Sequence, residues 1–152
     1  MRISARNSVL DDLDVEIINQ FDSDSSISNS RLAESVGLAA STALMRVRNL
    51  VKRGIIRKFT VDIDYGSIGL VVQSIVFLSL LRQDENTMSP MVQRISSAGN
   101  VVQIFHVSGN EDLLIHVAVS SSEDLRVFIQ KHLTSDPNVR NARTHLIFGH
   151  TR

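Results

Sequence analysis

Apolar residues change their spacing partway along the chain. From Leu10 to about Ile56 they recur every three or four residues, which is typical of amphipathic helices. Beyond Phe59, runs of continuous or alternating apolar residues, typical of strands, separate further helical stretches. The pattern therefore predicts an α+β protein with a helical N-terminal part and a mixed C-terminal part.

Three helices are predicted in the N-terminal part. Asp11 is placed to cap the first, and Ser28 to cap a short second helix that ends at Gly37. The third runs over about 40–53 and ends before Gly54. Its inward stripe is Ala43, Val47 and Leu50. Three helices with a glycine-containing turn between the second and the third form the helix-turn-helix arrangement.

The residues after the third helix predict a strand and a linker. Residues 55–62 alternate between apolar and polar side chains, as in a strand, and Arg57 and Lys58 would flank DNA there. Residues 65–69 contain the glycines and small polar residues of a linker. The predicted division is a helix-turn-helix domain over 1–62, a linker over 63–70 and a second domain over 71–152.

The second domain is predicted to run strand, helix, strand, strand, helix, strand. The strands are expected over 71–81, 101–107, 113–119 and 139–148. The helices are expected over 88–98, entered through Ser89 and Pro90, and over 122–133, capped by Ser121 or Ser122. This βαββαβ order is that of a ferredoxin-like domain, in which both helices lie on one face of a four-stranded sheet.

The first strand of that domain is apolar on both of its faces. Val72, Val76, Leu78 and Leu80 share one face, and Val71, Ile75, Phe77 and Leu81 share the other. The helices would cover only one of these faces, so the other also needs cover. A partner subunit is the predicted cover, and the chain's own N-terminal part is the alternative.

Positive charge gathers in one short region, although the whole chain has 16 basic and 16 acidic residues. Residues 30–60 contain seven lysines and arginines against Glu34 alone. Residues 1–29 contain two against six, and residues 61–152 contain seven against nine. A local excess of this kind is typical of a nucleic-acid-binding surface, and a solvated basic face is the alternative.

The polar face of the third helix suits DNA recognition. Small side chains in its first turn would let it approach base edges, and the longer polar side chains that follow would reach phosphates. A solvated amphipathic helix is the alternative, but helix order, turn and charge all favour recognition. The predicted DNA-binding residues are Ser41, Thr42, Met45, Arg46, Arg48, Asn49 and Lys52, with Arg57 and Lys58 beside them.

Composition excludes several other classes of protein. Apolar residues make up 43% of the chain, and seven glycines and two prolines are too few for a disordered or collagen-like protein. The absence of cysteine excludes disulfide scaffolds, thiolate metal sites and iron–sulfur clusters. The sequence shows no signal-peptide pattern and no run long enough to span a membrane, so a cytoplasmic protein is expected.

Catalytic and metal-binding patterns are sparse. The five histidines, His106, His116, His132, His145 and His150, lack close metal-ligand spacing, so no metal site is expected. The sequence has no glycine-rich phosphate loop, no nucleophile elbow and no paired catalytic carboxylates. We therefore predict a protein that is not an enzyme and that needs no cofactor.

Four blocks of the chain resemble the Lrp/AsnC family, the feast/famine regulators of bacteria and archaea. They are the opening helix over 10–18, the second helix and turn over 31–38, the third helix with its exit over 46–56, and the turn over 109–114. The resemblance implies a transcriptional regulator with a winged helix-turn-helix and a ligand-sensing domain. It also implies binding to double-stranded DNA, homodimers that assemble into tetramers or octamers, and an amino acid or related small molecule as effector.

The resemblance places the effector beside a turn of the second domain, between neighbouring dimers. The turn residues are Ser108, Gly109, Asn110, Glu111 and Asp112. Gly109 permits a positive φ that exposes backbone N–H groups to a carboxylate, and Asp112 suits an ammonium group. Taken alone, these residues favour an ordinary hairpin with solvated acids, and the resemblance is what assigns them to a site.

The chain departs from the family's pattern at the start of two helices. Ala39 stands where the family commonly has a capping serine, which forfeits roughly 1 kcal/mol of helix capping. Arg31 replaces an acidic residue that is common in the second helix, which removes a capping box but adds positive charge.

Two alternative functions remain open at this point. One is an architectural DNA-binding protein that has no effector. The other is an enzyme similar to the sirohaem decarboxylases, which share this fold. The turn over 109–112 argues against the enzyme, because it contains neither the histidine nor the arginine that matter near the ligand in those relatives.

Overall fold

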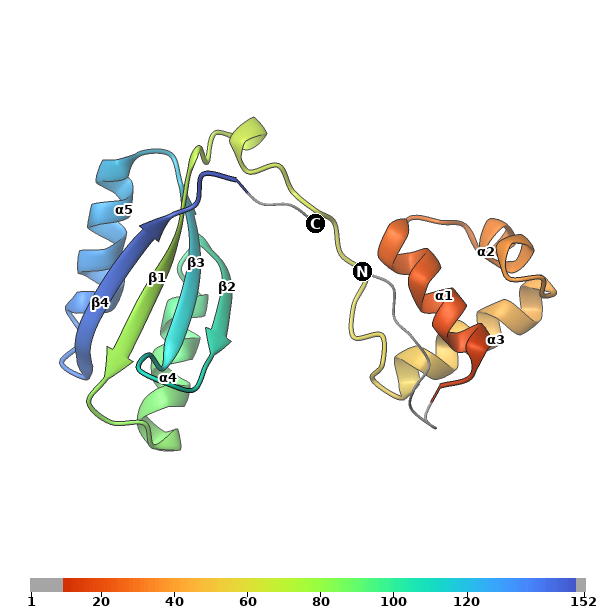
Figure 1. The fold of residues 1–152 in the computed structure, drawn as a ribbon, viewed down its shortest axis with the longest axis horizontal. Helices are drawn as coiled ribbons and strands as arrows, with labels where there is room; N and C mark the ends of the chain where they lie inside the picture. The colour runs from red at the N-terminus through yellow and green to blue at the C-terminus, as the bar shows by residue number, and fades with distance from the viewer. Residues whose placement is uncertain (1–9, 150–152) are drawn as a thin grey trace. The chain divides into compact units, whose positions relative to one another are not determined.

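The computed structural model describes residues 10–149, which form two compact units that divide between Ile63 and Asp64. We call residues 10–63 the helix-turn-helix unit and residues 64–149 the sheet unit. Figure 1 shows the helices of the first unit in red to yellow and the strands of the second in green to blue.

The helix-turn-helix unit contains α1 (Asp12–Ser23), α2 (Asn29–Ser35) and α3 (Ala40–Lys52). Their inward faces meet in a cluster of buried side chains made of Ile17, Leu32, Val47 and Leu50. The buried residues of α3 are Ala43, Val47 and Leu50. The three predicted helices and the predicted stripe of α3 are therefore confirmed.

The helix starts follow the predicted caps. Asp11 Oδ1 accepts the backbone N–H of Asp14 at 2.7 Å, and Ser28 Oγ accepts that of Arg31 at 3.3 Å. Ala39 takes the N-cap position of α3 and makes no side-chain cap bond. The first turn of α3 therefore lacks the hydrogen bond that a serine hydroxyl would accept at that position.

The predicted strand over 55–62 is wrong, because the structure has no strand between α3 and the first strand of the sheet unit. A strand needs a neighbouring strand to complete its backbone hydrogen bonds. This segment meets side chains of the helix-turn-helix unit instead. The ring of Phe59 lies 4.9 Å from that of Phe21, and the carbonyl of Thr60 accepts a hydrogen bond from Ser25 Oγ at 2.9 Å.

The sheet unit has four strands, β1 (Val72–Leu80), β2 (Val101–His106), β3 (Leu113–Val119) and β4 (Val139–Leu146). They lie in the order β2-β3-β1-β4, and each neighbouring pair is antiparallel. Helices α4 (Glu85–Ser96) and α5 (Ser122–Phe128) cover one face (Figure 1). A π-helical segment, η2 (Ile129–Thr134), extends α5, and a 3-10 turn, η1 (Gly66–Ile68), precedes β1. The predicted ferredoxin-like arrangement is confirmed.

Helix α4 begins three residues before its predicted start at Met88. Asp84 takes the N-cap position, where its carboxylate accepts a hydrogen bond from Thr87 Oγ1 at 2.9 Å. Its carbonyl accepts the N–H of Met88, also at 2.9 Å. Pro90 was the expected entrance to this helix, but it lies inside α4, and the first turn begins upstream of it, where the carbonyl of Asp84 accepts the N–H of Met88.

The two faces of β1 differ in burial. Val76 and Leu78 face the helices and are fully buried. Ile75 and Phe77, on the open face, are only half-buried, and Phe105 of β2 is 42% exposed. No described element of the sheet unit covers this open face (Figure 1). The sheet unit therefore presents apolar side chains on a face that its own helices leave uncovered.

Candidate nucleic-acid interface and effector loop

Four of the predicted DNA-binding side chains lie in one row along α3. At about 100° per residue, positions spaced by four, three and four residues fall on one face of a helix. This outward row is Ser41, Met45, Arg48 and Lys52. All four are exposed, Met45 by 57% of its surface, and they lie opposite the buried stripe. The row thus presents a hydroxyl and a thioether near the helix start and two cations further along.

The other predicted side chains of α3 fall in a second row. This flank row is Thr42, Arg46, Asn49 and Arg53, which follows the helix end. Arg46 donates from Nη1 to Asp11 Oδ2 at 2.7 Å and to Asp14 Oδ1 at 2.8 Å. Arg53 Nη1 lies 3.6 Å from the second carboxylate oxygen of Asp14. The start of α1 therefore holds two arginines that are two turns apart.

Burial distinguishes the contact with Asp14 from an ordinary surface ion pair. The Asp14 side chain is 11% exposed and that of Arg46 is 26% exposed. A carboxylate this buried loses hydration, and charge-assisted hydrogen bonds from guanidinium groups replace it. The bonds that Arg46 donates to Asp11 and Asp14 raise the pKa of Arg46 above its ordinary value. The chain itself thus holds Arg46 charged and in place.

The structure separates two arginines that the sequence pattern grouped. Both Arg46 and Arg48 lie outside the buried stripe, but they point about 160° apart around the helix. One sequence signal for the contact with α1 is a spacing. Arg46 and Arg53 are seven residues apart, so they lie on one face of α3, and two aspartates stand three residues apart at the start of α1. Whether Arg46 contacts DNA stays a prediction.

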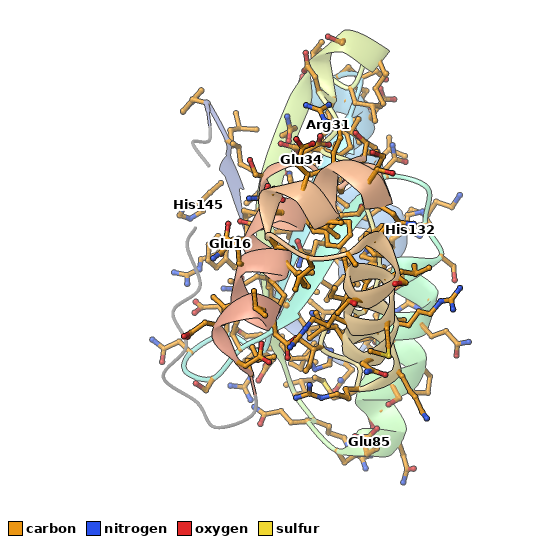
Figure 2. The ribbon with its side chains drawn as sticks, turned by 90° about the vertical axis from the view of Figure 1, so that its right-hand side faces the viewer. Glu16, Arg31, Glu34, Glu85, His132 and His145 are labelled. Carbon is orange, nitrogen blue, oxygen red and sulfur yellow. The ribbon has the colours of Figure 1, made fainter. Side chains whose placement is uncertain are left out.

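Further cations of the helix-turn-helix unit lie outside α3. Arg57 and Lys58 are exposed in the extended segment after the helix, and neither has an ion-pair partner among residues 10–149. Arg31 is exposed on α2, one turn before Glu34 (Figure 2). These side chains add positive charge to the unit that carries the outward row.

The turn over 108–112 is fixed to the end of β1. Ser79 Oγ donates to the carbonyl of Asn110 at 2.9 Å, and the N–H of Asp112 donates to the carbonyl of Leu78 at 2.8 Å. Gly109 has a φ of +123°, which side-chain-bearing residues rarely adopt, so the predicted need for glycine is confirmed. No described residue accepts a hydrogen bond from the N–H of Gly109 or Asn110.

Both acidic side chains of this turn contact other parts of the sheet unit. Asp112 Oδ2 accepts the backbone N–H of Leu80 at 2.6 Å, where the pairing of β1 with β4 shifts register. Glu111 forms an ion pair with Arg143 of β4. Neither is the freely solvated acid of an ordinary hairpin. Asp112 Oδ1 has no hydrogen-bond donor among the described residues.

The histidines do not converge on one site. His116 Nε2 lies 3.0 Å from Gln73 Oε1, while His132 and His145 stand on different elements (Figure 2). Burial lowers the pKa of His132 below its ordinary value of 6.5. Between residues 10 and 149 no group of three histidine, aspartate or glutamate side chains is placed to hold a metal ion, and no helix is long and apolar enough to cross a membrane. His150 lies outside the described residues.

Two family models match the chain, and each falls in one unit. A model described as winged helix-turn-helix DNA-binding matches residues 10–57. A model described as Lrp/AsnC ligand binding domain matches residues 73–151, which is more than half of the chain. The candidate interface lies in the first match and the turn over 108–112 in the second.

Curated relatives are similar along nearly the whole chain. The HTH-type transcriptional regulator AldR of Mycolicibacterium smegmatis is 38% identical over 143 residues, which cover 94% of this chain and 84% of AldR. The leucine-responsive regulatory protein of Rhizobium meliloti is 29% identical over 137 residues, which cover 90% of this chain and 88% of that protein.

Solved structures share the fold. The crystal structure of MtbAldR superposes with a TM-score of 0.83 at 32% identity and covers 97% of each chain. A transcriptional regulator from Neisseria meningitidis, solved as a complex with L-Met, superposes with a TM-score of 0.84 at 22% identity. That structure covers 94% of this chain and 92% of its own.

Proposed function

The chain belongs to the Lrp/AsnC family of transcriptional regulators, and we propose from this premise how it binds DNA and senses an effector. The family predicted from the sequence is confirmed, and so is the function. The protein is a DNA-binding transcriptional regulator with an effector-binding domain. The residues that perform each task are the subject of the proposal.

We assign DNA recognition to the outward row of α3, and the observation that carries this is its exposure opposite the buried stripe. Ser41, in the first turn, is short enough for the backbone to approach base edges in the major groove, and Met45, one turn further on, offers those edges an apolar contact. Arg48 and Lys52 reach phosphates, as do Arg57 and Lys58 beside the helix. Thr42 and Asn49 stand at the margin of the row and contribute polar contacts there.

The salt dependence of binding tests this assignment. A lost phosphate contact lowers the slope of log affinity against log salt by about one, whatever the DNA sequence. Arg48→Ala and Lys52→Ala should each show this change. Lys131→Ala, which removes an exposed charge from η2 in the sheet unit, should not. Unchanged slopes for both α3 variants would place the interface elsewhere. Met45 substitutions should alter sequence preference more than affinity.

We propose a free amino acid as the effector of the turn over 108–112. The backbone N–H groups of Gly109 and Asn110 suit its carboxylate, and Asp112 Oδ1 suits its ammonium group. Ser108 and Glu111 are the remaining residues of the turn, and Glu111 holds it to β4 through its ion pair with Arg143. The fold accommodates such a ligand, since the Neisseria structure is a complex with L-Met.

A thermal-shift screen of amino acids and their metabolites identifies the effector, because a compound that binds the native state raises the melting temperature. Calorimetric titration then tests the site. Gly109→Val should abolish binding, since valine strains a φ of +123° and its side chain occupies the open space beside the turn where the ligand would lie. Asp112→Asn keeps an oxygen for the Leu80 N–H but loses the charge, so it should weaken amino-acid binding. An architectural protein would respond to no compound in the screen.

We also propose that the open face of the sheet is a homodimer interface, and that dimers assemble further. The support is the set of half-buried apolar side chains on that face, among them Ile75 and Phe77. A ligand that touches two dimers would favour one assembly by its differential affinity. Because its relatives are transcriptional regulators, we expect the protein to act on DNA in the cytoplasm and to catalyse no reaction.

A further inference from the structure

We propose that Asp14 and Arg46 position α3 for DNA, so that Arg46 acts through α1 and not by contacting a phosphate. The contact consists of the Arg46 Nη1 bonds to Asp11 and Asp14, together with the ion pair between Asp14 and Arg53. We call these four side chains the α1–α3 clamp. The inference rests on the outward row being the DNA-binding face.

Apolar packing alone leaves the rotation of α3 weakly defined. Val47 and Leu50 hold the helix against the core, but apolar attraction has no preferred direction. With side chains, a helix has a radius of about 5–6 Å, so a rotation of roughly 20° moves an outward tip by about 2 Å. A displacement of that size breaks a hydrogen bond to a base or phosphate. A directional contact is needed to fix the rotation.

The α1–α3 clamp supplies that directional contact. Arg46 and Arg53 are seven residues apart, which is about 10 Å along the helix axis. The carboxylate of Asp14 lies between them and contacts both, one with each oxygen. Asp11, which caps α1 with its first oxygen, holds Arg46 with its second. The clamp thus fixes both the rotation of α3 and its position along its axis.

The same geometry argues against a phosphate contact by Arg46. Two aspartates and two arginines leave the clamp with no net charge. A phosphate would have to compete with two carboxylates, and that of Asp14 is 11% exposed, so breaking its ion pair would leave a poorly hydrated charge. The guanidinium of Arg46 also points about 120° away from Lys52 around the helix. Arg46 therefore adds nothing to the salt slope.

A double-mutant cycle separates positioning from contact. The variants are Asp14→Asn, Arg46→Gln and the double variant, titrated against a DNA site selected by the wild-type protein from a random pool. Affinity is measured by fluorescence anisotropy at 15 °C, where circular dichroism verifies that each variant is folded. We expect each single variant to bind at least about tenfold more weakly. The double variant should bind no more weakly than the weaker single, and all three should keep the wild-type salt slope.

Matched variants control for charge and for folding. Asp12→Asn removes the same charge from the same turn of α1, but Asp12 is exposed and outside the clamp, so wild-type affinity is expected. Arg46→Lys keeps a cation within reach of both aspartates and should recover part of the lost affinity. If Asp14→Asn is not folded at 15 °C, Asp11→Asn replaces it, because asparagine retains the cap. We expect Asp11→Asn to bind DNA a few-fold more weakly than the wild type.

Three results would overturn the proposal. One is a salt slope that falls by about one in Arg46→Gln, together with tighter binding by Asp14→Asn, as expected if Asp14 competes with a phosphate. The second is a folded Asp14→Asn variant that binds DNA with wild-type affinity. The third applies if Asp14→Asn does not fold: it is a folded Asp11→Asn variant that binds DNA with wild-type affinity. Arg48→Gln is measured alongside. If the salt slope of DNA binding does not fall in this variant, the proposed DNA-binding role of the outward row is wrong, and the α1–α3 clamp is not what the result contradicts.

Discussion

A cluster of four buried apolar side chains forms the core of the helix-turn-helix unit, whereas a cluster of twelve forms the core of the sheet unit. With fewer fully buried apolar side chains, the first unit relies more on individual polar groups, namely its caps and the α1–α3 clamp. The second has a large core on one side of its sheet and uncovered apolar side chains on the other. The two units should therefore differ in what stabilises them: the caps and the α1–α3 clamp in the first unit, and apolar burial on the helix-covered face of the sheet in the second.

The largest effect is expected from a charge placed on each face of β1. Val76→Asp puts an unpaired carboxylate at a fully buried position and should destabilise the sheet unit by more than about 4 kcal/mol. Phe77→Asp, on the open face, should leave a folded and soluble monomer. Light scattering after size-exclusion chromatography, with circular dichroism, distinguishes these outcomes. A monomeric wild type at micromolar concentration would refute the dimer.

The next effect concerns a polar group on which the sheet unit does depend. Asp112→Ala leaves the N–H of Leu80 without its acceptor and should cost about 1–3 kcal/mol. Asp112→Asn should cost clearly less, because its amide oxygen still accepts that bond. Tyr65 is the only tyrosine, the chain has no tryptophan, and Tyr65 lies in the sheet unit, so urea unfolding followed by tyrosine fluorescence reports on this unit. Equal stability of the two variants would contradict the structural role of Asp112.

A smaller gain is expected in the helix-turn-helix unit from the missing cap. Ala39→Ser adds an acceptor for the first turn of α3 at a backbone conformation that caps adopt, with φ −66° and ψ 145°. It should stabilise that unit by about 1 kcal/mol. Helical circular dichroism should then show later unfolding while the tyrosine signal stays unchanged. A shift in the tyrosine transition would mean that the two units do not unfold independently.

The smallest effect is expected from Ser74, which is fully buried on the helix-covered face of β1. Its hydroxyl oxygen is the one buried side-chain polar atom without a hydrogen-bond partner among the described residues. Ser74→Ala removes an unsatisfied group and should be neutral or stabilise the sheet unit by up to about 1 kcal/mol. Urea unfolding followed by tyrosine fluorescence measures the change in stability. A variant that is less stable than the wild type by more than about 1 kcal/mol would show that the hydroxyl has a hydrogen-bond partner.

The sequence predicted most elements because their causes are local. Asp11 and Ser28 cap the helices that follow them, and a nearly continuous apolar run marks β1. The strand over 55–62 was wrong because pairing depends on a neighbour, which alternation does not reveal. The predicted start of α4 was wrong because the helix begins at Glu85 and continues through Pro90.

In the candidate sites, too, local features could be predicted from the sequence, and contacts between distant segments could not. The exposed outward row follows from helical spacing, and the positive φ of Gly109 from its place in a turn. The engagement of Arg46 by α1 depends on how two helices pack, which their separate patterns do not specify. The bond from Leu80 to Asp112 likewise joins segments that are far apart in the sequence.

We propose that the outward row of α3 lies against DNA, and site-directed cleavage tests this most directly. The chain has no cysteine, so a single one can be introduced and made to carry an iron–EDTA group that cleaves nearby DNA. Ser41→Cys, on the outward row, should cut the bound DNA at a few positions within the major groove of each half-site. Gln93→Cys, at an exposed position on α4 of the sheet unit, is the control and should cut weakly and without pattern. Focused cleavage from Gln93→Cys, with none from Ser41→Cys, would show that the outward row does not lie against DNA.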